Sequence, residues 1–208
     1  FYLSRRFDVN AEISRFESQI AAQDTAFVVE PTYFTSDFAR ETLAGLADRY
    51  DLHVIHTRRD PIERIKSAYR FERKQQADTW GAQLAKQHDL AGYVRARLAR
   101  PKDRQCRNFQ TARLASMCPG DAPELDRALQ AIEVLRETGV IGRVEAFDDA
   151  LAQLSTRLHD SYPEFTWEST KANVSVPVAD SGNESKLNEE LATHNSDDLH
   201  LWKAAAIA

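Results

Sequence analysis

The stretch Val54-Ile-His-Thr-Arg-Arg59-Asp60-Pro61-Ile-Glu-Arg64-Ile-Lys-Ser67-Ala-Tyr69 decides how the chain is expected to fold. Residues 52–57 form a short apolar run rich in β-branched side chains, which is typical of a buried strand. Asp60 can cap a helix and Pro61 suits its first position, and the apolar residues that follow recur at helical spacing to about residue 73. The stretch therefore predicts a strand that runs directly into a helix.

The same order of elements precedes this stretch. Residues 25–30 form an apolar run that ends at Pro31, and residues 36–50 have helical periodicity. A strand followed by a helix, twice in succession, favours a parallel sheet with right-handed crossovers. The remaining periodicity predicts helices at 9–23, 124–137, 147–159 and 184–202, a largely helical middle at 80–117, and a strand at 140–144.

The composition narrows the classes of protein to consider. A length of 208 residues fits one domain that spans residues 1–208. The net charge of −5 argues against general nucleic-acid binding, and no apolar run approaches the ~20 residues that a membrane-spanning helix needs. Two cysteines are too few for a disulfide scaffold or a zinc site, so we expect free thiols and no metal. The residue usage favours a bacterial cytoplasmic protein, with the lumen of a Golgi-like compartment as the alternative.

The junction between the predicted strand and helix can hold an anion. The amides and dipole at a helix N-terminus attract negative charge, and Arg59 at the strand end can make a charge-assisted, bidentate contact. Ser67 lies in the second helical turn, and Arg64 can pair with Asp60 or with a ligand. The alternative is a capped surface helix with a mixed charged face, because short motifs often match by chance.

The segment from Arg59 to Tyr69 resembles the 3′-phosphate-binding motif of sulfotransferases, above all the carbohydrate enzymes and their bacterial relatives. Three further segments resemble the same family in the same order. They are Asn108-Phe-Gln110, Gly142-Arg-Val-Glu145-Ala-Phe147-Asp, and Asn173-Val-Ser followed by Asn195-x-x-Asp198-Leu-x-Leu-Trp202. An ordered set of four segments is a more specific signal than any one of them, and it covers the chain from about Phe27 to the C-terminus.

The resemblance implies a helix-rich, three-layer α/β fold with a central parallel sheet like that of P-loop NTPases. It implies the donor 3′-phosphoadenosine 5′-phosphosulfate as co-substrate, with Arg59 and Ser67 on its 3′-phosphate and no metal ion. Glu30 occupies the place of the general base in the family, beside Tyr33 as a substrate-positioning residue; the alternative for Glu30 is a strand end that faces water. Lys171 and Asn173 are candidate nucleotide contacts.

The acceptor is expected to be a hydroxyl compound, most simply a carbohydrate. Arg70, Arg73 and Lys74 continue the Ser67 helix and are candidate substrate-binding residues, because their charge suits an acidic or sulfated sugar. A second basic cluster can do the same, but we favour a solvated helical face whose charge nearby acids balance. Its members are Arg95, Arg97, Arg100, Lys102, Arg104 and Arg107.

One element of the family is missing from this sequence. The family begins with a strand and a Lys-Thr-Gly-type loop that holds the 5′-phosphosulfate, whereas here the first lysine is Lys66 and the first glycine is Gly45. Because the chain starts at Phe1, we expect this loop to precede it. The alternatives are a non-catalytic relative that binds a 3′-phosphonucleotide or another anion, and a P-loop-type nucleotide phosphotransferase.

Overall fold

The computed structural model describes residues 14, 17–18, 45, 53–168 and 184–204. The predicted strand 25–30 and the candidate residues Glu30, Tyr33, Lys171 and Asn173 lie outside this part of the chain. The described elements are β1 (Val54–Arg58), α3 (Pro61–Lys74), α4 (Trp80–Gln87), α5 (Leu90–Leu98), α6 (Phe109–Ala115), α7 (Glu124–Thr138), β2 (Gly139–Arg143), a 3₁₀ turn (Val144–Ala146), α8 (Phe147–Leu158), α9 (Glu184–His194) and α10 (Ser196–Ala204). These bounds confirm the predicted strands near 52–57 and 140–144 and the helices near 62–73, 124–137 and 147–159.

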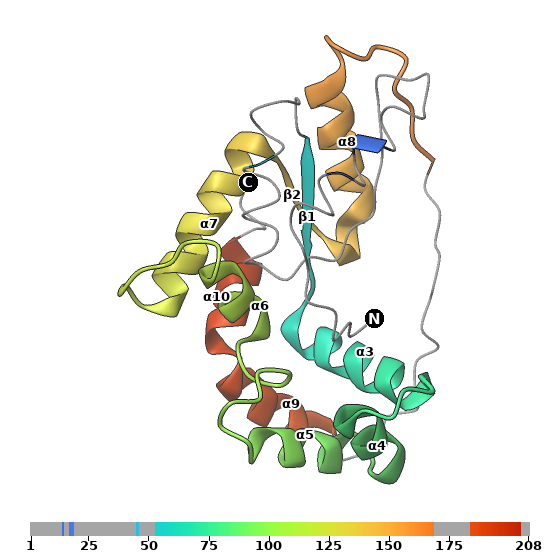
Figure 1. Ribbon diagram of the computed structural model, residues 1–208, viewed down its shortest axis with the longest axis vertical. Coiled ribbons are helices and arrows are strands. Elements are labelled where there is room, and N and C mark those ends of the chain that lie inside the picture. Colours follow the sequence, from blue (N-terminus) through green and yellow to red (C-terminus); the bar gives the residue numbers. More distant parts are fainter. Residues whose placement is uncertain (1–13, 15–16, 19–44, 46–52, 169–183, 205–208) are drawn as a thin grey trace.

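The two described strands pair in parallel, with Ile55 opposite Val140 and Arg58 opposite Arg143. Neighbouring side chains in a strand point to opposite faces. Val140 accordingly packs with apolar residues of α8, whereas Ile141 packs with a cluster built mainly from α6 and α7. The helices α7 and α8 therefore cover opposite faces of the small sheet, as Figure 1 shows on either side of the strands.

Helix α8 lies close to the sheet because β2 carries a glycine at the contact. A Cβ atom built on Gly142 would lie 2.5 Å from the Cβ of Ala150 in α8, well inside van der Waals contact. This glycine belongs to one of the four segments that resemble the sulfotransferases. Its structural role here is to let a helix approach the sheet.

A second core lies at the helical end of the molecule, beyond the carboxyl end of β1. Ile65 of α3 packs there with Leu84 of α4, Tyr93 of α5 and Leu191 of α9. Figure 1 shows these four helices gathered at the end of the molecule away from α8. The cluster fixes the direction in which α3 leaves the sheet, and so it positions the residues that follow Asp60.

Two expectations differ from the structure. The helical middle at 80–117 is divided into α4, α5 and α6, and the predicted helix 184–202 is broken into α9 and α10 at Asn195. The side chain of Asn195 causes the break, because it bonds to backbone groups of another segment as well as to Leu191 O. The described residues give a helix-rich α/β arrangement with a two-stranded parallel sheet. Among the helices described, none has the length and apolar character needed to cross a membrane.

Candidate functional site

The junction between β1 and α3 is built as the sequence predicts, with Asp60 as the cap of α3. Its Oδ1 atom accepts hydrogen bonds from the amides of Ile62 (2.9 Å) and Glu63 (3.0 Å). This geometry changes one expectation, because the carboxylate already satisfies two amides that were expected to attract a phosphate. An anion at this junction must therefore be held mainly by side chains.

Two further segments meet the junction at its backbone. Gln110 forms a pair of hydrogen bonds with Arg59: the Arg59 amide donates to Gln110 Oε1 (3.1 Å), and Gln110 Nε2 donates to the Arg59 carbonyl (2.9 Å). The next amide, that of Asp60, donates to Glu145 Oε1 (3.0 Å). Segments that lie far apart in the sequence are thus joined at the point where β1 ends.

The fourth segment holds Gln110 in place. The buried carboxylate of Asp198 accepts hydrogen bonds from the amides of Gln110 (3.0 Å) and Thr111 (2.7 Å) and from the Thr111 hydroxyl (2.7 Å). Asn195 Oδ1 accepts from the amide of Asn108, whose positive φ of 40° starts helix α6. These contacts supply the first amides of α6 with partners from Asn195 and α10. The described parts of the four resembling segments therefore meet at the β1–α3 junction.

The side chains of Arg59, after β1, and Ser67, in the second turn of α3, form no hydrogen bond within the described chain. Arg59 Nε lies 3.9 Å from Glu145 Oε1, beyond hydrogen-bonding distance, and within the described part of the chain the guanidinium forms no hydrogen bond. The half-buried Ser67 hydroxyl has no hydrogen-bond partner among those residues either. Arg59 precedes α3 with a long 3.9 Å ion pair to Glu145, and Ser67 lies in the second turn of α3, so both can offer hydrogen-bond donors to a ligand.

Two of the three candidate substrate residues extend the Ser67 face of α3. Ser67, Arg70 and Lys74 are spaced three and four residues apart and therefore lie along one side of the helix. Arg73 lies elsewhere and is engaged: its Nη1 atom donates to the Tyr69 hydroxyl and, at 3.4 Å, to the carbonyl of His88. The structure thus separates Arg70 and Lys74 from Arg73, which ties α3 to the segment after α4.

Arg64 contacts the segment that leads into α6. Its Nη2 atom donates to the carbonyl of Gln105, and its guanidinium lies 4.4 Å from the centre of the Phe109 ring. Arg64 therefore connects α3 to the start of α6.

Arg58, the neighbour of Arg59, has the opposite environment. It is 2% exposed, and its Nη1 atom donates to the carbonyl of Leu201 (2.6 Å). That carbonyl is among the last four of α10, which have no partner within the helix. Burial, with a smaller effect of Arg136, lowers the pKa of Arg58 to about 10, and burial together with Arg58 lowers the pKa of His56 to about 4. The sequence gives no sign of this difference between adjacent arginines.

The second basic cluster is balanced by nearby acids as expected, but it is not solvated throughout. Arg97 is buried and binds Glu72 (2.6 Å) and Asp103 (2.8 Å), and the Tyr93 hydroxyl donates to the same Glu72 carboxylate (2.9 Å). Elsewhere in the cluster, Arg104 pairs with Glu124 at 2.8 Å and Arg107 donates to two carbonyls. Acids therefore balance part of the cluster, but Arg97 lies inside the protein and not on a solvated face.

Both cysteines are free, as expected. Cys106 is buried, and this burial raises the pKa of its thiol to about 12. Such a thiol stays protonated near neutral pH and is a poor nucleophile. No group of three or more metal-ligating side chains occurs in the described ranges, 53–168 and 184–204 included.

A search of known proteins found a relative in Archaeoglobus fulgidus, described as an uncharacterized protein, that is 36% identical over 148 residues. The match covers 68% of this chain and 57% of the archaeal protein, so the chain spans little more than half of that relative's length. No protein-family model and no solved structure matches the chain. The archaeal relative has no described activity, so the similarity does not indicate a function for this chain.

Proposed function

We propose that this chain belongs to a sulfotransferase that moves a sulfuryl group from 3′-phosphoadenosine 5′-phosphosulfate to a hydroxyl, in the simplest case that of a carbohydrate. The proposal includes the three-layer, P-loop-like fold that the sequence resemblance implies, of which the described sheet would be one part. Arg59 and Ser67 are assigned to the 3′-phosphate of the donor.

One observation carries the proposal. At the β1–α3 junction Gln110 binds the amide and carbonyl of Arg59 and Glu145 binds the amide of Asp60, while the side chains of Arg59 and of Ser67 in the second turn of α3 have no hydrogen bond within the described chain. A fixed backbone with free polar side chains is a preorganised arrangement for binding. Arginine with a hydroxyl suits a phosphate group, because the guanidinium donates two parallel hydrogen bonds.

The chemistry would be an in-line transfer. The acceptor hydroxyl oxygen forms a bond to the donor sulfur as the bond from sulfur to the 5′-phosphate oxygen breaks and its electron pair goes to that oxygen. The hydroxyl proton passes to the carboxylate of Glu30, which Tyr33 would accompany in orienting the acceptor. Positive groups near the leaving phosphate stabilise its growing charge.

The other assigned side chains fit this scheme as binding groups. Arg70 and Lys74 share the Ser67 face of α3, so they would meet the part of the nucleotide or acceptor that extends beyond the 3′-phosphate. Lys171 and Asn173 are assigned to the nucleotide by resemblance. Arg73 stays assigned to the acceptor through its other guanidinium atoms, because the bonds to Tyr69 and His88 use only Nη1.

Calorimetry with two nucleotides tests the donor site. Wild-type protein should bind 3′-phosphoadenosine 5′-phosphate more tightly than adenosine 5′-phosphate, and Arg59→Ala should remove this preference. Losing one charge-assisted phosphate contact costs about 2 kcal/mol, or about 30-fold in affinity, and Ser67→Ala should have a smaller effect. Arg157→Ala is the control, since its exposed guanidinium lies on α8 and donates to the Glu137 carbonyl. Equal affinities for the two nucleotides would refute the assignment.

Turnover distinguishes a transferase from a binding module. The Glu30→Gln variant should keep nucleotide affinity and lose sulfuryl transfer from the labelled donor to an acceptor, because the amide cannot take the proton. Full turnover by this variant would exclude Glu30 as the base. Nucleotide binding without any transfer by the full-length wild-type protein would favour the non-catalytic alternative.

A further inference from the structure

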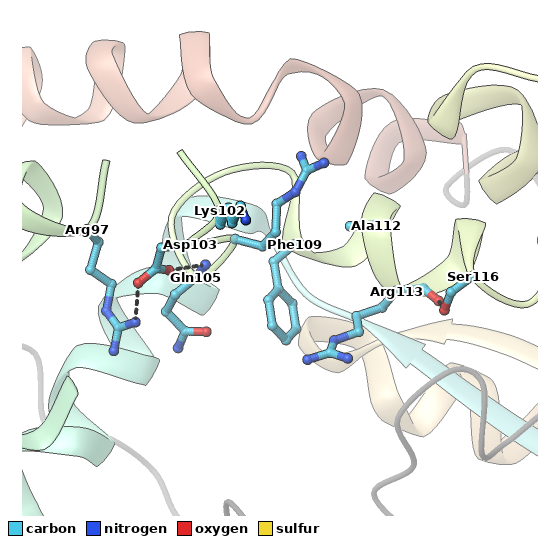
Figure 2. A pocket seen from close by; sticks show the side chains of 9 residues that line it. Arg97, Lys102, Asp103, Gln105, Phe109, Ala112, Arg113 and Ser116 are labelled. Carbon is cyan, nitrogen blue, oxygen red and sulfur yellow. Dashed lines mark hydrogen bonds and ion pairs between the residues drawn. The ribbon is translucent and has the colours of Figure 1, made fainter. Parts of the chain in front are cut away.

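A cavity of about 360 Å³ lies on α6 beside the segment that precedes it, and no role has been assigned to it so far. Lys102, Gln105, Phe109 and Arg113 are among the residues that line it. Figure 2 shows the ring of Phe109 at the centre of these residues, with Gln105 on one side and Arg113 on the other. The cavity is open at the surface and large enough for one sugar unit.

The charge of the lining is strongly positive in a protein whose net charge is −5. Four lining residues are cations and one, Asp103, is an acid. Arg97 is held by Glu72 and Asp103, and Arg104 by Glu124. Lys102 and Arg113 are exposed, and over the described ranges neither forms an ion pair or hydrogen bond. Two cations at the rim are therefore available to an anionic ligand.

The aromatic and amide side chains of the lining offer packing and hydrogen-bonding contacts in addition to charge. The Arg113 guanidinium lies 5.2 Å from the centre of the Phe109 ring, and Arg64 lies on the same ring at 4.4 Å. The side-chain amide of Gln105, a residue 8% exposed, belongs to the same lining. When the exposed Arg113 side chain turns from the ring to an anionic group, the ring can pack against the C–H face of a sugar while the planar polar groups hydrogen-bond to its hydroxyls.

We propose that this cavity binds an acidic saccharide, with Lys102 and Arg113 contacting a carboxylate or sulfate group and Phe109 packing against the sugar ring. The inference rests on the proposed sulfotransferase function and specifies its acceptor as a saccharide that is already negatively charged. The two sites share a helix: Gln110, which bonds to the backbone of Arg59, directly follows Phe109 in the chain. Binding at the cavity would therefore hold the acceptor close to the element that fixes the donor site.

Calorimetric titration of the full chain with a heparin-derived hexasaccharide and with neutral maltohexaose tests the proposal. The acidic hexasaccharide should bind and the neutral one should not. Arg113→Ala should lower affinity about tenfold and Lys102→Ala by a smaller factor, since each removes one charge-assisted contact. Phe109→Leu should weaken binding without changing its dependence on salt, because it removes the ring and no charge.

Arg157→Ala is the matched control, as it removes one exposed positive charge on α8. If Arg157→Ala weakens binding as much as Arg113→Ala, the interaction is with the overall charge and the proposed site is wrong. Equal binding of the two hexasaccharides, or no binding of either, also overturns the proposal, as does equally tight binding of a single-stranded oligonucleotide that depends on Arg113.

The titration contains no nucleotide, so its result is independent of the donor site. Arg59→Ala should retain hexasaccharide affinity while losing the preference for the 3′-phosphate. If the wild-type protein binds the hexasaccharide but shows no preference for the 3′-phosphonucleotide, the proposed function is refuted. If it shows that preference but does not bind the hexasaccharide, only the proposal for the cavity is refuted.

Discussion

Two sets of polar side chains differ sharply in how the fold uses them, although helix α6 and its cap residue supply members of both. The interlocked set consists of Asn108, Gln110, Asn195 and Asp198, whose side chains bond to backbone groups of distant segments. The open set consists of Arg59, Ser67, Lys102 and Arg113, which have no hydrogen bond from the side chain within the described chain.

Helix α6 shows the contrast within a single turn. Gln110 is fixed by Arg59 and Asp198, while Arg113 extends into the cavity of Figure 2. Buried polar groups must find partners inside the protein, because leaving them unpaired costs stability. Exposed groups without partners carry no such requirement. Buried polar side chains with partners, the interlocked set among them, should therefore control stability, and the open set should control binding. Four predictions test this difference.

The largest loss of stability is expected from Glu72→Ala at the helical end. Glu72 is 3% exposed and binds both Arg97 and Tyr93, so its removal leaves a buried guanidinium with only Asp103 to balance it. Breaking a buried pair in this way costs about 4 kcal/mol. Urea unfolding gives the measurement. Glu133→Ala, which removes an exposed carboxylate paired with Arg136 on α7, should change stability by less than about 0.5 kcal/mol.

Asp198→Ala should give the second largest loss of unfolding free energy, about 3 kcal/mol. The amides of Gln110 and Thr111 and the Thr111 hydroxyl all lose a buried, charged acceptor. Amide hydrogen exchange at Gln110 and Thr111 should accelerate by a matching factor. The partly exposed neighbour Asp197 accepts one side-chain bond from Asn108, so Asp197→Ala should cost about 1 kcal/mol. Similar losses in the two variants would contradict a special role for Asp198.

Acid should weaken the fold through His56. Burial and Arg58 lower the pKa of His56 from 6.5 to about 4 in the folded protein. Between these values the unfolded chain binds a proton that the folded chain does not, so stability falls as pH falls through this window. Linkage gives a loss of about 2 kcal/mol from pH 7 to pH 5. His56→Leu should remove this part of the slope, whereas His159→Gln, at an exposed position, should not; an unchanged slope in His56→Leu would assign the effect to other groups.

Much of the fold could be predicted because local signals and the structure agree. The Asp60 cap, the proline after it and the apolar spacing placed α3 within a residue or two of its observed bounds. The strand at β2 was predicted equally well. The break between α9 and α10 could not be predicted in this way. It depends on the hydrogen bond from the Asn195 side-chain amide to the carbonyl of Cys106, and no residue near Asn195 in the sequence indicates that contact.

For the candidate site, too, the sequence predicted some features and not others. The resemblance pointed to Arg59, Ser67, Gln110, Glu145 and Asp198, but it did not indicate which of them hold backbone and which are free. That distinction depends on contacts between residues far apart in the chain, as between Gln110 and Arg59. The different environments of Arg58 and Arg59 also follow from tertiary packing: β1 turns Arg58 toward α10, and the sequence of the strand does not identify that neighbour.

The smallest change in stability is expected where the functional effect is largest. Arg59→Ala removes a side chain that is 31% exposed, and its nearest acid, Glu145, lies 3.9 Å from Nε. The hydrogen bonds of Gln110 reach only the Arg59 backbone, so they survive the substitution. Unfolding free energy should therefore change by less than about 0.5 kcal/mol, while affinity for the 3′-phosphonucleotide falls. A loss of 2 kcal/mol or more in urea unfolding would place Arg59 with the interlocked set and remove the distinction on which the assignment of the donor site rests.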